Sequence, residues 1–138
     1  MSASPYILGA KPKRKNKSPE HDIQVSLIAM LQSIEPTPLY TATVGGVRLA
    51  IHTAKKMKEA GYSKGVPDLL VFEPRGMYEG LAIEVKTPNG RASPEQKEWI
   101  AKLNSRGWSA HITHGLDEAL DVMSCLLYTS PSPRDGRE

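Results

Sequence analysis

The chain has 138 residues, of which 18 are lysine or arginine and 15 are aspartate or glutamate, and its formal net charge is +3. This length indicates one domain with a substantial core. There is no apolar run of about 18 residues and no signal-type hydrophobic N-terminus, so we expect a cytoplasmic protein without a membrane span. Cys125 is the single cysteine, which excludes an internal disulfide and a zinc site built from thiolates.

The positive charge is concentrated near the N-terminus. Five of the basic residues lie within residues 11–17, and the rest of the chain carries a net charge of −2. We expect residues 1–17 to form a basic flexible tail that either touches DNA phosphates nonspecifically or only keeps the protein soluble. Residues 128–138 break all hydrophobic periodicity, have the composition of a disordered tail and resemble translated vector sequence. The domain is therefore expected within residues 18–127.

The domain begins with a helix. Ser18 and Pro19 are typical of an N-cap and a first helical position, and the apolar spacing predicts a helix that ends near Ile34. Glu20 lies in phase with the apolar stripe of this helix. It either complements the positive end of the helix dipole or supplies a third carboxylate to a metal site.

Short β-type segments follow at residues 40–44 and 48–51, on either side of a glycine pair that predicts a turn. Residues 52–60 predict a lysine-rich helix that is closed by a glycine. Arg48, Lys55 and Lys64 either form a patch that binds DNA phosphates or belong to an ordinary solvated surface.

Two apolar runs, at residues 69–72 and 81–86, carry the strongest chemical signal and predict antiparallel strands. A hairpin centred on Gly76 pairs residues whose numbers add up to 152, so Asp68 faces Glu84 with Cβ atoms about 4.5 to 5.5 Å apart. This separation suits one hard cation such as Mg²⁺, which prefers oxygen ligands.

Lys86 follows two residues after Glu84, so the two side chains lie on the same face of the strand. There the ammonium group of Lys86 can hold a scissile phosphate or orient the attacking water. The alternative is an ordinary antiparallel sheet with charged residues on its solvent-facing side.

A second capped helix follows this strand. Ser93 and Pro94 predict its start, and Gly107 its end. Gln96 either completes a capping box with Ser93 or helps the positive helix end to position water or phosphate.

Residues 108–113 predict a further strand, and residues 116–127 an amphipathic helix in which Cys125 is expected to be in the core. His111 and His114 are three residues apart, but they fall on the strand and its exit. Without a third nearby ligand they do not indicate a zinc site.

The order of these motifs resembles the PD-(D/E)xK nuclease superfamily. More narrowly, the phrases VGGVRLA, AGYSKGVPDLLVF and LAIEVKTPNGRASPEQKEWIAKLNSRGW are similar to stand-alone VRR-NUC domains, the virus-type replication-repair nucleases. The resemblance implies an α/β fold with a restriction-endonuclease-like core, in which a central mixed sheet is flanked by helices.

The same resemblance implies an activity and a set of site residues. It implies a Mg²⁺- or Mn²⁺-dependent DNA endonuclease with Asp68, Glu84 and the carbonyl of Val85 as metal ligands. It makes Lys86 the catalytic lysine, and Glu20 and Gln96 further active-site residues. It also implies a homodimer that acts on branched DNA such as a four-way junction. The alternative is a catalytically inactive DNA-binding or repair scaffold.

Overall fold

The computed structural model describes residues 18–43 and 50–128, so residues 1–17 and 129–138 of the expected tails and the predicted glycine turn lie outside the described residues. The described part contains four helices and four strands. In chain order they are α1 (Pro19–Ser33), β1 (Tyr40–Ala42), α2 (Ile51–Glu59), β2 (Leu69–Val71), β3 (Leu81–Lys86), α3 (Pro94–Ser105), β4 (Ser109–His114) and α4 (Leu116–Leu127). None of these helices is long and apolar enough to span a bilayer.

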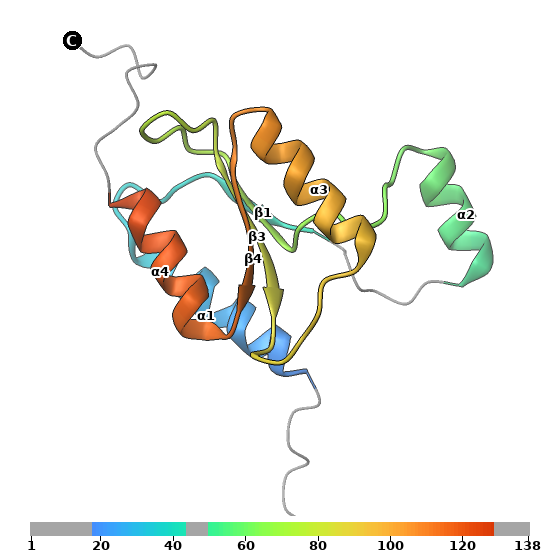
Figure 1. Cartoon of the computed structure of the whole chain (residues 1–138), viewed down its shortest axis with the longest axis horizontal. Coiled ribbons are helices and arrows are strands. Elements are labelled where there is room, and N and C mark those ends of the chain that lie inside the picture. The colour runs from blue at the N-terminus through green and yellow to red at the C-terminus, as the bar shows by residue number, and fades with distance from the viewer. Residues whose placement is uncertain (1–17, 44–49, 129–138) are drawn as a thin grey trace, which may run out of the picture.

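The strands form one mixed sheet in the order β1-β2-β3-β4 (Figure 1). β2 pairs antiparallel with β1 and β3, and β3 pairs parallel with β4 through a crossover that contains α3. Leu69 pairs with Ile83 and Val71 pairs with Leu81, so paired residue numbers add up to 152 as predicted. The mixed sheet and its flanking helices confirm the expected fold class.

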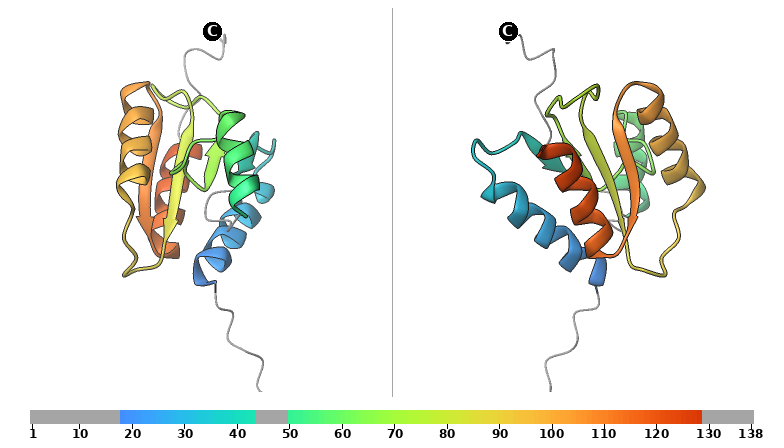
Figure 2. Two further views of the ribbon diagram at one scale, coloured as in Figure 1. Left: turned by 90° about the vertical axis from the view of Figure 1, so that its right-hand side faces the viewer. Right: turned by 60° about the vertical axis from the view of Figure 1, so that its left-hand side comes forward.

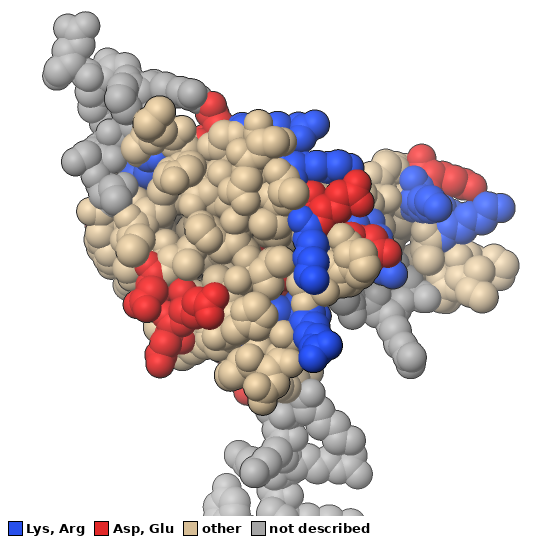
Figure 3. Space-filling model, in the orientation of Figure 1, with Lys and Arg blue, Asp and Glu red and all other residues tan. Residues whose placement is uncertain are grey.

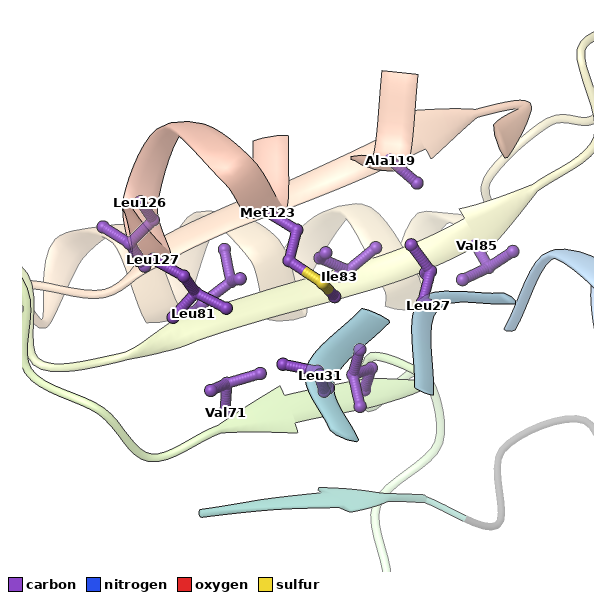
Figure 4. Close-up of a cluster of buried hydrophobic side chains, with 11 residues drawn as sticks. Leu27, Leu31, Val71, Leu81, Ile83, Val85, Ala119, Met123, Leu126 and Leu127 are labelled. Atoms are coloured by element: carbon purple, nitrogen blue, oxygen red, sulfur yellow. The ribbon is translucent and has the colours of Figure 1, made fainter. Parts of the chain in front are cut away.

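Helices cover both faces of the sheet, with α3 on one face and α1 and α4 on the other (Figure 2). Leu81, Ile83 and Val85 alternate along β3 and face α1 and α4. Leu27 from α1 and Met123 from α4 complete the centre of this core (Figure 4). The core therefore holds β3 through the face that meets α1 and α4. The residues between Leu81, Ile83 and Val85 point to the opposite face of the sheet.

Small residues line the face of the sheet that α3 covers. Ala82 and Ala110 are buried there. They alternate with the core residues of β3 and β4, and their small side chains let α3 lie close to the sheet. Glu84 and Lys86 share this face, so the catalytic candidates lie between the sheet and the start of α3.

α2 stands apart from the layered body (Figure 1), and none of its residues is buried. The prediction of a strand as far as Ile51 is wrong, because Ile51 is the first residue of α2 and is 84% exposed. A short apolar run cannot be assigned to strand or helix by periodicity alone. The predicted helix itself is confirmed, and Gly61 follows it with a φ of 105°.

The boundaries of α4 agree with the predicted helix, but the predicted burial of one of its residues is wrong. Cys125 is exposed, so its predicted place in the core is wrong. The buried stripe of α4 consists of Ala119, Met123, Leu126 and Leu127. Cys125 lies off this stripe, because each residue advances about 100° around the helix.

Candidate active site

A cleft of about 400 Å³ opens where β2 begins and β3 ends. Its walls come from α1, the loop before β2, the end of β3 and the start of α3. The structure brings all five side chains of the predicted catalytic set to this cleft, and they are Glu20, Asp68, Glu84, Lys86 and Gln96.

Asp68 is held at the start of β2 by bonds that extend the sheet. Its carbonyl oxygen accepts from the backbone N–H of Thr43 at 2.9 Å, and its carboxylate accepts from the backbone N–H of Val85 at 2.8 Å. The register continued by one position places Asp68 opposite Glu84. The carboxylate is therefore aimed at β3 by the backbone of that strand.

Pro67 explains why the backbone carbonyl of Val85 lacks a hydrogen bond from β2. The register pairs Val85 with Pro67, and proline has no N–H to donate to the Val85 carbonyl. The carbonyl of Lys86 accepts from Gly115 on the β4 side at 2.8 Å. Because backbone groups alternate along a strand, the carbonyl of Val85 points to the other side, toward β2 and Asp68.

Glu84 is an almost fully buried carboxylate, with 3% of its surface exposed. Its Oε1 accepts from Gln96 Nε2 at 2.7 Å and lies 3.5 Å from Lys86 Nζ. Its Oε2 is buried and has no hydrogen-bond partner among the described residues. Burial, followed by the charge of Asp68, raises the pKa of Glu84 from 4.5 to about 8.

Gln96 completes the predicted capping box and also makes a contact that its sequence position did not suggest. Its backbone N–H donates to Ser93 Oγ at 3.2 Å, and its Oε1 accepts from the Ser93 N–H at 2.8 Å, which completes the capping box. The remaining part of the amide, Nε2, donates to Glu84. The cap thus fixes the Gln96 side chain so that its amide holds the buried carboxylate.

The backbone amides at the start of α3 are already used. Pro94 has no N–H, Gln96 N–H donates to the Ser93 side chain, and Lys97 N–H donates to the Ser93 carbonyl at 3.0 Å. Glu95 accepts from its own backbone N–H, which together with Lys64 lowers its pKa. The Gln96 side chain, and not the amides of the helix end, is therefore what α3 offers to the cleft.

The donor set fits a hard divalent cation. Asp68 and Glu84 are paired carboxylates, burial raises the pKa of Asp68 as it does that of Glu84, and one buried oxygen of Glu84 is unsatisfied. Neither the described helices nor the described strands bring three Asp, Glu, His or Cys residues together as a metal-binding group. A bound cation would rest on the two carboxylates, the Val85 carbonyl and waters, which is a coordination that Mg²⁺ accepts.

Glu20 and Lys86 occupy opposite kinds of environment in the cleft. The Lys86 side chain is only 12% exposed and lies against Glu84. Glu20 is exposed in the first turn of α1, and its charge contributes to the raised pKa of Asp68. Glu20 is thus near enough to act electrostatically, although it does not form a three-carboxylate group with Asp68 and Glu84.

The predicted DNA-binding residues are dispersed. Lys64 lines the cleft and lies 3.9 Å from Glu95. Lys55 is exposed on α2 and does not line the cleft, and Arg48 lies outside the described residues. Two further cleft residues, Tyr62 and Arg91, were not predicted. Their only signal is position, because Tyr62 lies six residues before Asp68 and Arg91 five residues after Lys86.

Comparison with known proteins shows which family of domains this chain resembles. The family model of the VRR-NUC domain matches residues 20–117. A solved structure described as a VRR_NUC domain protein has 28% sequence identity and a TM-score of 0.72 to this chain. The similarity covers 83% of this chain and 92% of that one. No curated protein matches the sequence. The chain belongs to the VRR-NUC family of nuclease-type domains.

Proposed function

We propose that the protein is a Mg²⁺- or Mn²⁺-dependent DNA endonuclease that hydrolyses phosphodiester bonds, with branched DNA such as a four-way junction as its substrate. The observation that carries this proposal is the pair formed by the buried Glu84 and the half-buried Asp68 beside Lys86. Two neighbouring carboxylates repel one another when both are ionised, and a divalent cation bound between them would favour the ionised forms. The chemistry of the cleft is thus suited to a divalent metal and a phosphate.

The side chains of the cleft have separate roles in this proposal. Asp68 and Glu84 hold the cation, which when bound supplies polarisation of the phosphate and a more acidic water. Lys86 binds a phosphate oxygen or orients the attacking water through its ammonium group. Gln96 holds Glu84 through a hydrogen bond, and Glu20 lines the cleft and adds negative charge there.

DNA is held by positive charge around the cleft. Lys64 lies on the cleft wall, and the α2 helix carries Lys55, Lys56 and Lys58 on a surface with no buried residue. Figure 3 shows lysine and arginine side chains on α2 and along the neighbouring face of the molecule. These charges would bind the phosphates of a duplex arm, and their contribution would fall as salt increases.

The expected homodimer would place two such clefts on one branched substrate and produce paired incisions. Static light scattering at the concentration used for cleavage measures this directly. A dimer supports paired incision, whereas a monomer that still cuts both strands removes the dimer from the proposal.

Incubation of the purified protein with a four-way junction, a flap and a plain duplex, each with Mg²⁺ or with EDTA, tests the activity. We expect Mg²⁺-dependent cutting that favours the branched substrates. Binding without cutting would identify the protein as an inactive DNA-binding scaffold. Equal cutting of all three substrates would retain the nuclease and remove the branched-DNA preference.

A further inference from the structure

Two loops line the cleft, and each contributes one side chain that the proposed catalytic roles leave unused. Residues 61–67 contribute Tyr62, and residues 87–93 contribute Arg91. Unlike the carboxylates of the cleft, which suit a cation, these two side chains suit parts of a nucleotide. An aromatic ring offers a stacking surface, and a guanidinium offers a planar set of donors for phosphate.

The loop that carries Tyr62 is fixed against α3. Trp99 Nε1 donates to Ser63 Oγ at 3.3 Å. Gly65 has a φ of 95°, and a Cβ added there would lie 2.6 Å from the carbonyl carbon of Glu95. Such a close backbone approach is available only to glycine. The position of Tyr62 is therefore set by the fold before any substrate binds.

Tyr62 itself is only half-buried, and its backbone N–H donates to the Met57 carbonyl at 2.8 Å. Its hydroxyl makes no hydrogen bond to another residue of the described ranges. Buried tyrosine hydroxyl groups usually have a partner. A tyrosine that is anchored by its backbone, with its side chain left on the cleft wall, is suited to contact a ligand.

Arg91 contrasts with the other arginines that the structure describes. Arg75 lies 3.7 Å from Glu73, and Arg106 donates to the Lys102 carbonyl at 3.1 Å. Arg91 is exposed at the cleft and has neither an ion pair nor a hydrogen bond within the described part of the chain. An unpaired guanidinium beside a phosphodiester-cleaving site is available for a phosphate of the substrate.

The size of the cleft limits which part of a DNA strand can enter it. A space of about 400 Å³ is at the small end of ligand-binding pockets, which suits a single nucleotide and not a base pair within a duplex. A base inside a duplex is stacked and paired, so a side chain on the cleft wall reaches it only when it is turned out or unpaired.

We propose that the cleft receives a nucleotide that is unpaired at the cleavage position, with its base stacked on Tyr62 and a neighbouring phosphate bound by Arg91. This inference rests on the proposed nuclease activity and narrows its substrate. The protein then cuts strands that are locally single-stranded, such as those at the branch point of a flap or a junction, in preference to continuous duplex. Tyr62 supplies this preference, and Arg91 sets the position of the strand.

Cleavage of two matched substrates tests the role of Tyr62. One is a continuous duplex, and the other is the same duplex with two unpaired nucleotides at the cut site. We expect the wild type and Tyr62→Phe to prefer the unpaired substrate, and Tyr62→Ala to lose about tenfold of that preference. Tyr78→Ala is the matched control, because Tyr78 is 45% exposed and lies outside the cleft. An unchanged ratio in Tyr62→Ala would overturn the stacking role.

A binding measurement without metal separates this inference from the proposed activity. A 2-aminopurine placed at the unpaired position should be quenched by the wild-type protein in EDTA and not by Tyr62→Ala. Quenching without cleavage in Mg²⁺ would retain the stacking site and reject the nuclease. Cleavage without a Tyr62-dependent signal would retain the nuclease and reject the stacking site.

Salt dependence tests Arg91. We expect Arg91→Ala to weaken binding of the unpaired substrate and to reduce the slope of log affinity against log salt by about one. Arg106→Ala should leave the slope unchanged, because Arg106 lies beyond the opposite end of α3. An Arg91→Ala slope equal to that of the wild type would remove Arg91 from phosphate binding.

Discussion

Replacing Glu84 with glutamine should make the metal-free protein less sensitive to pH. Burial and the charge of Asp68 raise the pKa of Glu84 to about 8 in the folded protein, from an ordinary value of 4.5. A carboxyl group with a raised folded-state pKa binds its proton more tightly when folded. The folded state is therefore favoured at low pH, and stability is lost as the pH rises from about 4.5 to about 8.

The size of the stability loss follows from the same pKa shift of Glu84. At about 1.4 kcal/mol for each pH unit, the full shift corresponds to an upper limit of roughly 5 kcal/mol. Solvent at the open side of the cleft screens the charges and reduces this value, so we expect a loss of about 2 to 3 kcal/mol between pH 5 and pH 8.5. For a domain of this size, that loss lowers Tm by about 10 °C.

Thermal unfolding in EDTA across this pH range measures the effect. The wild type should lose stability toward high pH, and Glu84→Gln should have a much flatter profile. Glu98→Gln is the matched control, because Glu98 is an exposed glutamate on α3 that pairs with Lys102, and it should retain the wild-type profile. A flat wild-type profile, or an unchanged slope in Glu84→Gln, would show that Glu84 does not cause the pH dependence.

Three further predictions concern residues around Asp68 and Glu84. Gln96→Ala should lower the free energy of unfolding by about 1 kcal/mol in urea and also reduce cleavage, whereas Ser93→Ala should affect mainly stability. Equal activity in the two variants would show that the side-chain amide of Gln96 has no role in cleavage. Gly65→Ala should lower stability by about 1 to 3 kcal/mol more than Gly76→Ala, because both have positive φ but only the first meets backbone atoms. Glu20→Gln should reduce cleavage strongly without changing Tm, and wild-type turnover would leave Glu20 as a helix-end charge only.

Local rules were sufficient to predict the centre of the site. The register of β2 and β3 follows from a two-residue side-chain period and a short turn, so it placed Asp68 opposite Glu84 correctly. The capping box at Ser93 was equally predictable, because it depends on residues three apart. The sequence could not show that the same Gln96 side chain also reaches Glu84, since that contact joins two different elements.

The errors and omissions share a physical cause. Whether Cys125 is buried depends on which face of α4 meets the sheet, and whether residue 51 begins a helix depends on contacts beyond a short apolar run. Tyr62 and Arg91 lie on loops whose paths are set by tertiary contacts such as Gly65 against the backbone of α3. Such contacts leave no periodic pattern in the sequence.

In the proposed function, Asp68 and Lys86 act in metal-dependent hydrolysis of DNA. Single-turnover cleavage of a branched substrate by the wild type, Asp68→Asn and Lys86→Ala, with Mg²⁺ and with EDTA, measures whether they do. We predict Mg²⁺-dependent cutting by the wild type and a rate at least about 100-fold lower in each variant, with Tm nearly unchanged. Undiminished cutting by either folded variant would contradict the account.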